Sequence, residues 1–230
     1  MVYADKTAVI HGDRSYDYKT LADRVLRLAN LLIQSYGVKP GDRVAVLCQN
    51  VPAFLDANFG IPAAGAILVP LNTRLTQPEI EYIITHSGAS VLIVQEELLD
   101  RVSPKVLSTV KAAIKVANYQ NKGDAPCPYE QKLYNTKIEL LWNDLPLTTD
   151  ENAVLSINYT SGSTGRPKGV MSSHRGCYML AVSMSIHTQL TTQSVYLWTL
   201  PMFHCNGWNF SWAVVATGGN QEREKNATGN

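Results

Sequence analysis

The sequence predicts an α/β protein with mainly parallel sheets and helices on both faces. Short apolar runs alternate along the chain with stretches of helical periodicity. The run at residues 43–48 (RVAVLC) is typical of a strand buried on both faces of a parallel sheet. Alternating strands and helices imply right-handed crossovers and a sheet covered on both sides. With 230 residues, the chain is long enough to bury a substantial core.

The first expected elements are two short strands, at residues 9–10 and 15–18. A helix follows, because apolar residues recur there at three- to four-residue intervals on one face. These residues are Leu21, Val25, Leu28 and Leu32. We expect this helix to begin at Thr20, with Asp23 three positions later, and to end at Gly37.

The same alternation continues as far as residue 116. Strands are expected at residues 66–70, 90–94 and 113–116, and helices at 53–64, 76–87 and 97–110. Thr76, Pro78 and Glu79 favour a helix start, and Gly88 favours its end. Residues 118–152 interrupt the pattern with glycines, prolines and polar residues, so we expect a long surface excursion.

Three more elements are expected after this excursion. They are a strand at 170–173, a helix at 175–188 and a buried strand at 195–200. Residues 212–216 (WAVVA) are apolar and would leave a hydrophobic face uncovered if nothing packs on them. Residues 220–230 are almost wholly polar, which is typical of a disordered tail.

The composition is that of an ordinary soluble protein. A formal net charge of +1 provides no basic surplus for nucleic acid, so no nucleic-acid partner is expected. The longest apolar stretch is broken by prolines and polar residues, so no membrane span is expected. The N-terminus lacks the apolar core of a signal peptide. The four cysteines form no CxxC pair, and we expect neither a zinc site nor a disulfide framework.

The most informative segment is residues 159–170 (YTSGSTGRPKGV). Its three glycines let the main chain approach a ligand closely, and successive N–H groups in such a turn form an anion-binding concavity. Hydroxyl donors and two cations add contacts for phosphate oxygens. The residues expected to bind nucleotide phosphates are Thr160, Ser161, Gly162, Ser163, Thr164, Gly165, Arg166 and Lys168.

Two other interpretations of this segment are less consistent with its residues. A Walker A loop needs Gly-x-x-x-x-Gly-Lys-Ser/Thr, whereas here Lys168 precedes Gly169 and Val170. That spacing disfavours a P-loop phosphotransferase. A flexible Gly/Ser linker would not need a lysine and a proline between two apolar strands.

The segment resembles the phosphate loop of the adenylate-forming (AMP-binding) superfamily, which includes acyl-CoA synthetases. Residues 65–74 and 87–93 are similar to further segments of that family. Residues 201–208 (PMFHCNGW) resemble the motif that lines the acyl pocket, in a form closer to acyl-CoA synthetases than to peptide-synthetase domains. The resemblance implies an incomplete N-terminal part of the adenylate-forming enzyme fold.

The resemblance also implies a two-step ligase reaction. A carboxylic acid substrate would attack Mg-ATP to form an acyl-adenylate, and coenzyme A would then displace AMP. Thr164 would lie beside the phosphates and Mg²⁺, and His204 would orient the carboxylate. The alternative for His204 is a histidine hydrogen-bonded at a strand end. Fatty, aromatic and short branched acids all remain open as substrates.

Several family segments do not appear in this sequence. They are the Tyr-Gly-x-Thr-Glu segment, the ribose-binding aspartate and the small domain with the catalytic lysine. We therefore expect residues 1–219 to form a partial N-terminal AMP-binding domain, truncated and inactive alone. The alternative is a catalytically inert nucleotide- or acyl-binding regulatory protein. By resemblance the location is cytoplasmic or peroxisomal, and the chain carries no targeting signal that we identify.

Overall fold

Two β-sheets organise the protein, and the computed structural model describes residues 2–117, 127–160 and 165–223. Within these residues one sheet has the strand order β6-β5-β3-β4-β7-β8 and the other the order β2-β1-β10-β9. The larger sheet comprises β3 (Arg43–Leu47), β4 (Ile67–Pro70), β5 (Ala89–Gln95), β6 (Ala112–Val116), β7 (Val154–Thr160) and β8 (Lys168–Ser173). The smaller comprises β1 (Thr7–His11), β2 (Arg14–Asp17), β9 (Val195–Leu197) and β10 (Asn220–Arg223).

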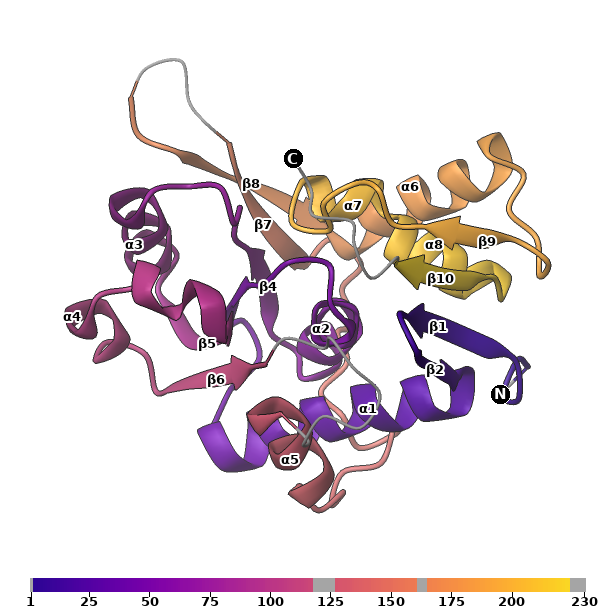
Figure 1. Ribbon diagram of the computed structural model, residues 1–230, viewed down its shortest axis with the longest axis horizontal. Coiled ribbons are helices and arrows are strands. Elements are labelled where there is room, and N and C mark those ends of the chain that lie inside the picture. Colours follow the sequence, from indigo (N-terminus) through magenta and orange to yellow (C-terminus); the bar gives the residue numbers. More distant parts are fainter. Residues whose placement is uncertain (1, 118–126, 161–164, 224–230) are drawn as a thin grey trace.

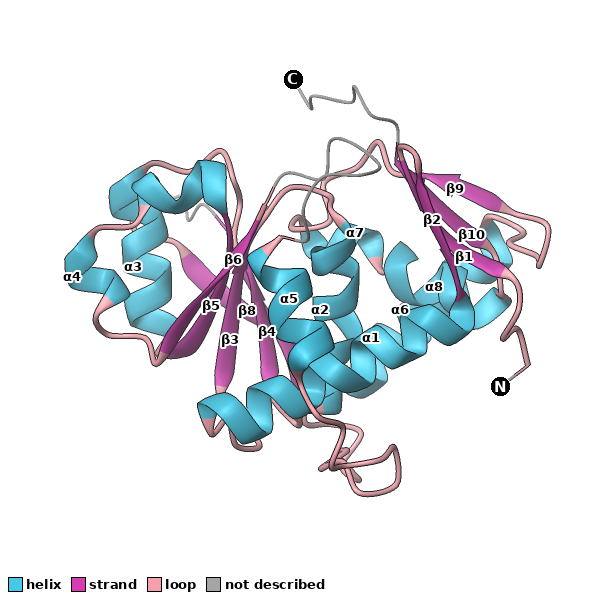
Figure 2. Ribbon diagram, turned by 60° about the horizontal axis from the view of Figure 1, so that its bottom comes forward, coloured by secondary structure: helices cyan, strands magenta, loops and turns pink. Residues whose placement is uncertain are grey.

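Most neighbouring strands are parallel. In the larger sheet only β7 and β8 pair antiparallel, and in the smaller only β1 and β2 do so. The helices are α1 (Tyr18–Asn30), α2 (Pro52–Ala63), α3 (Gln77–Ser87), α4 (Pro104–Leu107), α5 (Pro128–Asn135), α6 (His174–His187) and α8 (Phe210–Thr217), and the segment labelled α7 (Cys205–Trp208) is a turn with left-handed backbone angles. Helices α3 and α4 lie on one face of the larger sheet, and α1, α2 and α5 lie on the other (Figure 2).

The strands of the larger sheet bury side chains on both faces. In β3, Val44 and Val46 join the core under α1 and α2, whereas Ala45 and Leu47 join the core under α3. All four side chains have no measurable exposure, which explains the uninterrupted apolar run in the sequence. The expected α/β class with helices on both faces is therefore confirmed.

A buried ion-pair cluster joins the three helices on one face of the sheet. The Arg24 guanidinium of α1 donates to Asp56 of α2 at 2.7 Å and to Glu130 of α5 at 2.7 Å. Tyr129 adds a hydrogen bond to the same Asp56 carboxylate at 2.9 Å. Burial opposes the charged form of Arg24, but the neighbouring acids outweigh it and hold its pKa well above the ordinary value. The cluster fixes how α1, α2 and α5 pack together.

Two expected helices differ from their predictions. Helix α1 begins at Tyr18 rather than Thr20, because the Asp17 carboxylate accepts the Thr20 N–H at 2.7 Å and caps the first turn. Residues 97–110 do not form one helix. They divide into a 3₁₀ segment, Glu96–Arg101, and the short α4, which Ser103 caps.

Two segments expected to be irregular contain regular structure. Within 118–152, α5 buries Tyr129 and Leu133 completely, so this part is not a surface excursion. Within 220–230, residues 220–223 form β10 between β1 and β9, which corrects the prediction of a disordered tail there. Backbone pairing on both sides stabilises this polar strand without requiring apolar side chains. Residues 224–230 lie outside the described residues.

The apolar segments near the C-terminus also differ from expectation. Strand β9 spans only Val195–Leu197 and is partly exposed at the edge of its sheet, so it is not a buried strand of six residues. Residues 212–216 belong to α8, where Ala213 and Val214 are fully buried. The expected uncovered apolar surface lies on α6 and β8 instead. Within the described ranges, no helix is long and apolar enough to cross a membrane.

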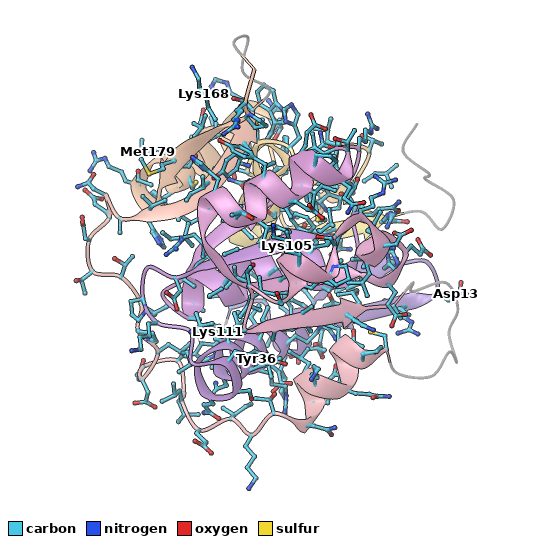
Figure 3. The ribbon with its side chains drawn as sticks, turned by 90° about the vertical axis from the view of Figure 1, so that its left-hand side faces the viewer. Asp13, Tyr36, Lys105, Lys111, Lys168 and Met179 are labelled. Carbon is cyan, nitrogen blue, oxygen red and sulfur yellow. The ribbon has the colours of Figure 1, made fainter. Side chains whose placement is uncertain are left out.

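The exposed apolar surface, which we call the α6 face, is carried by α6 and β8. Figure 3 shows one of its residues, Met179, at the outside of the molecule. Only Cys177 and Ala181 of α6 are buried. The exposed apolar side chains of the α6 face are Val170, Met171, Tyr178, Met179, Leu180, Val182 and Ile186.

Replacing Arg24 with Met should destabilise the protein strongly. The substitution leaves two buried carboxylates without their cation, which costs about 3–5 kcal/mol in the free energy of unfolding. Urea unfolding followed by circular dichroism measures the change. Lys19→Ala, on the exposed side of the same helix, is the matched control and should change stability by less than about 0.5 kcal/mol. Equal midpoints for Arg24→Met and the control would contradict the proposed importance of the cluster.

The α6 face should bind a hydrophobic dye such as anilinonaphthalene sulfonate. Contiguous apolar patches of this kind are uncommon on soluble monomers and associate readily with apolar compounds. We expect Met179→Lys with Ile186→Lys to reduce dye fluorescence by at least about half. The control pair, Gln77→Lys with Gln193→Lys, adds the same charge at exposed polar positions. A similar loss of fluorescence in both pairs would show that net charge, not this face, governs dye binding.

Candidate functional site

The segment at residues 159–170 forms the turn region of a β-hairpin. Strands β7 and β8 pair antiparallel, with Thr160 opposite Lys168 and Tyr159 opposite Gly169. Strand β7 also pairs with β4, so the base of the hairpin belongs to the larger sheet. The remainder projects beyond the sheet on the side of α3 (Figure 1). Lys168 lies on this projecting part (Figure 3).

Four of the predicted phosphate-binding residues are described, and all four are exposed. They are Thr160, Gly165, Arg166 and Lys168. Ser161, Gly162, Ser163 and Thr164 lie outside the described residues. Because Thr160 and Lys168 face each other across the hairpin, a hydroxyl and an ammonium group stand at neighbouring strand ends. This places one hydrogen-bond donor and one cation where an anion can contact both.

Gly169 permits close packing between the two strands. A Cβ atom at this position would lie 2.9 Å from Cγ2 of Ile157 and 3.2 Å from Cζ of Tyr159. Real Cβ atoms essentially never approach other atoms as closely as the first of these distances. A larger residue would therefore push β8 away from β7 and displace Lys168, the neighbour of Gly169.

The predicted catalytic residue, His204, lies in a tight turn and not at a strand end. Strand β9 ends at Leu197, and the His204 N–H donates to the Pro201 carbonyl at 3.2 Å. The imidazole is exposed, and its Nδ1 is 3.8 Å from the Cys205 Sγ. An exposed ring is available to contact a ligand from solvent.

The five residues after His204 all adopt left-handed backbone angles. Their φ values run from +49° at Cys205 to +61° at Asn209. Four of them are not glycine, and each such residue costs roughly 1–2 kcal/mol of conformational strain. The fifth, Gly207, lies so close to Trp198 that a Cβ would be 2.5 Å from the indole ring. Strain of this kind is tolerated only where surrounding contacts determine the conformation.

A buried amide network holds this turn against β7. The Asn206 side-chain amide donates to the Ser156 hydroxyl at 2.8 Å, and the Asn158 side-chain amide donates to Oδ1 of Asn206 at 3.3 Å. Asn206 and Ser156 are 3% and 0% exposed, respectively. The strand that leads into the hairpin is therefore hydrogen-bonded to the turn that carries His204.

Asn50 anchors the other end of the same turn to the larger sheet. Its side-chain amide donates to the Leu200 carbonyl at 2.7 Å and accepts the Met202 N–H at 2.7 Å. Asn50 follows the carboxyl end of β3, and the hairpin follows the carboxyl end of β7. In open α/β sheets, ligands bind at this edge. The fold therefore brings the His204 turn and the base of the hairpin together there, although they are about forty positions apart in the sequence.

The anchoring residues were not among the predicted site residues. Asn206 lies within the motif at 201–208, and an Asn-Gly pair favours left-handed turns, so its backbone was predictable. The hydrogen bond of Asn206 to Ser156 could not be predicted, because no local sequence pattern links two residues fifty positions apart. Asn50 could not be predicted either, because the sequence shows only that it follows a strand.

Two apolar cavities lie apart from this site. One, of about 430 Å³, is lined by α1, α2, α8 and residues 142–148, and the other, of about 400 Å³, lies between α6 and α8. Both are lined by His174 and Trp212, and burial lowers the pKa of His174. Neither is lined by His204 or by a residue of the hairpin tip. The second cavity is also lined by Tyr178, Val182 and Ile186 of the α6 face.

The described residues offer no protein cage for a metal ion. Within the described ranges, no three His, Cys, Asp or Glu side chains lie together as a metal-binding group. Thr164, the predicted metal ligand, lies outside those ranges. Mg²⁺ commonly binds to substrate phosphates with only one or two protein ligands, so a cage is not required for it.

The sequence matches the profile of a family described as AMP-binding enzyme over residues 1–221. The chain is 38% identical to 4-hydroxybutyrate–CoA ligase 2 of Metallosphaera sedula over 221 residues, which covers 94% of this chain and 40% of that protein. It is 37% identical to the peroxisomal benzoate–CoA ligase of Arabidopsis thaliana over 228 residues, which covers 94% of this chain and 39% of that protein.

The fold is similar to that of solved structures. The N-terminal domain of FACL13 from Mycobacterium tuberculosis matches with a TM-score of 0.80 and 26% sequence identity, covering 97% of this chain and 54% of that one. The chain thus spans about 40% of the length of the curated relatives it matches. The expected N-terminal part of the adenylate-forming fold is confirmed.

Substituting Asn206 should loosen the turn that carries His204. Asn206→Ala removes the bond to Ser156 and places a Cβ-bearing residue without a polar side chain at φ +53°, for a cost of roughly 1–3 kcal/mol. Hydrogen exchange at the Gly207 and Asn209 amides, which close the turn, should accelerate at least about fivefold.

Asn206→Gly separates the two effects, because glycine tolerates the backbone angles but still lacks the amide. Asn206→Gly should still show most of the faster hydrogen exchange expected for Asn206→Ala if the side-chain hydrogen bonds stabilise the turn more than backbone strain destabilises it. Gln193→Ala, an exposed polar position elsewhere, is the control. Native exchange rates in Asn206→Gly would show that the amide network does not hold the turn.

Proposed function

Because the chain belongs to the AMP-binding enzyme family, we propose that it takes part in ATP-dependent activation of a carboxylic acid. The carboxylate oxygen attacks the α-phosphate of ATP, an acyl-adenylate forms and pyrophosphate leaves. The thiol of coenzyme A then displaces AMP to give a thioester. Support comes from the relatives named as CoA ligases and from the hairpin, whose base is hydrogen-bonded to the His204 turn and whose projecting part carries Arg166 and Lys168.

In this proposal the hairpin binds the leaving phosphates. Lys168 acts as a point charge and Arg166 as a planar fork for phosphate oxygens, while the Thr160 hydroxyl contributes a further hydrogen bond. Ser161, Gly162, Ser163, Thr164 and Gly165 complete the proposed phosphate contacts. Phosphoryl and adenylyl transfer depend mainly on positioning and on neutralisation of developing charge, which these groups supply.

Magnesium accompanies ATP, and we assign Thr164 as its protein ligand. The donor set suits such an ion, because a hydroxyl beside phosphate oxygens provides hard oxygen ligands. When bound, the ion neutralises phosphate charge. The residues of the chain then orient the reactants around it.

His204 orients the carboxylate in this proposal. Its imidazole is exposed on a turn that Asn50 and Asn206 fix to β3 and β7. A ring held in this way can hydrogen-bond to the substrate carboxylate and present its oxygen to the α-phosphate. The relatives include ligases named for hydroxybutyrate and for benzoate, which supports a carboxylic acid as the substrate.

The cellular location is also a proposal. The Arabidopsis benzoate–CoA ligase is named as peroxisomal. We propose a cytoplasmic or peroxisomal location for this chain, and fluorescence microscopy of the tagged native gene product tests it.

The test of function is nucleotide binding followed by pyrophosphate exchange. We expect ATP and pyrophosphate to bind in calorimetry, and Lys168→Ala to weaken both. The loss corresponds to one charge-assisted contact, roughly 1.5–3 kcal/mol in a water-excluded site and less in an open one. Lys115→Ala, an exposed lysine on β6 of the same sheet, is the matched control.

The outcomes separate two functions. Acid-dependent incorporation of labelled pyrophosphate into ATP, lost in His204→Ala, supports the ligase. Binding of ATP that Lys168→Ala weakens, without exchange for any acid tested, would favour an inert nucleotide-binding protein. Equal ATP binding by wild type and Lys168→Ala would refute the assignment of the hairpin.

A further inference from the structure

Helix α3 is held rigidly beside the hairpin. At its N-terminus, Thr76 and Glu79 form a reciprocal capping box. At its C-terminus, Arg43 of β3 donates to the Ser87 carbonyl at 2.6 Å and to the Gly88 carbonyl at 2.9 Å. The inner side of the helix packs three isoleucines into the core under the sheet. Side chains on its outer side therefore stand at fixed positions.

Tyr82 and His86 form a stacked pair on that outer side. They are four residues apart, so they are neighbours on one face of the helix. Their ring centroids lie 5.1 Å apart with an interplanar angle of 30°. His86 is exposed and Tyr82 is half-buried. His86 lies outside the core that holds α3 in place, whereas Tyr82 packs against the edge of that core.

The pair contacts both arms of the hairpin, which are the outgoing arm, ending with β7 at Thr160, and the returning arm, which runs from Gly165 into β8. The outgoing arm is reached through Tyr159, whose hydroxyl is 2.8 Å from Nδ1 of His86, with the two rings edge to face at 5.8 Å. The returning arm is reached through Arg166, whose guanidinium carbon lies 5.7 Å from the centre of the Tyr82 ring. A single turn of α3 thus touches residues on either side of the hairpin tip.

These contacts lie next to the proposed phosphate-binding groups. Tyr159 precedes Thr160 in β7, and it faces Gly169, the neighbour of Lys168, in β8. Because the backbone of Gly169 lies against the Tyr159 ring, a displacement of that ring would disturb β8 beside Lys168. Tyr82 acts on Arg166 directly. The two contacts therefore determine where the described hydroxyl and cations stand.

We propose that Tyr82 and His86 are positioning residues for the hairpin, with His86 fixing the outgoing arm through Tyr159 and Tyr82 holding Arg166 on the returning arm. Ordering a flexible arm when a ligand binds reduces affinity, and an arm that is already held avoids this loss. The role in nucleotide binding rests on the proposed function, whereas the effect on hairpin order does not.

The first experiment measures hairpin order without any ligand. Hydrogen exchange at the β7–β8 amides of the full chain should accelerate about fivefold to tenfold in His86→Ala, in proportion to the loss of one hydrogen bond. Tyr159→Phe should give a similar acceleration, and the double variant should be no faster than either single one. His187→Ala, an exposed histidine at the end of α6, is the control.

A conservative variant separates positioning from a general structural role. The side-chain amide of Asn can occupy the place of Nδ1, so His86→Asn should restore slow exchange, and Tyr82→Phe should likewise retain the contact with Arg166. Because His86 lies outside the core and Phe at position 82 keeps the ring that packs against it, urea midpoints of the His86 variants and of Tyr82→Phe should stay at the wild-type value. Unchanged exchange in His86→Ala and Tyr159→Phe would overturn the proposal.

The second experiment adds inorganic pyrophosphate and ATP as probes. The dissociation constants should rise about threefold to tenfold in His86→Ala and Tyr82→Ala. In His86→Asn and Tyr82→Phe they should return to the wild-type values. Faster exchange with unchanged affinity would overturn the role in ligand binding. Absence of binding by the wild type itself, with the exchange effects intact, would overturn the proposed function while supporting the contact of α3 with the hairpin.

Discussion

Burial of both faces of the larger sheet is the constraint on which the remaining structure depends. Strand β3 divides its side chains between two cores, one closed by α1, α2 and α5 and the other by α3 and α4. A parallel sheet needs both covers, because each strand crosses to the next through a helix. Arg24 stabilises the layer formed by α1, α2 and α5, because its guanidinium pairs with acids on the other two helices. With both faces occupied, the strand ends are where the chain can form a binding site.

The site at those ends combines strain with polar anchoring. Five consecutive left-handed residues follow His204, and such a run persists only because the surroundings hold it. Asn206 and Asn50 provide the hydrogen bonds, and Gly207 allows Trp198 to approach the backbone. The hairpin is held differently, through the Tyr82–His86 pair on one helix face. Both segments thus take their positions from rigid elements of the larger sheet and its helices.

Much of the fold and part of the site could be predicted from the sequence. Strands β3, β4, β5 and β6 and helices α2 and α3 agree with apolar runs, capping residues and Gly88, because these patterns reflect short-range sterics and hydrogen bonds. The predicted loop residues that are described lie together on the hairpin. Strand β10 and helix α5 were missed, since their stability comes from distant partners: β1 and β9 in one case, Arg24 in the other.

By itself the sequence determined the order of most elements and the family of the chain, and it predicted which residues could bind a phosphate. Composition and spacing suffice for these, because they depend on which groups stand near one another along the chain. Only the tertiary structure decided that Asn206 bonds to Ser156, that His86 meets Tyr159 and that the α6 face stays uncovered. Each of these depends on two segments meeting across the sheet, and side-chain chemistry within one segment does not specify which distant segment it meets.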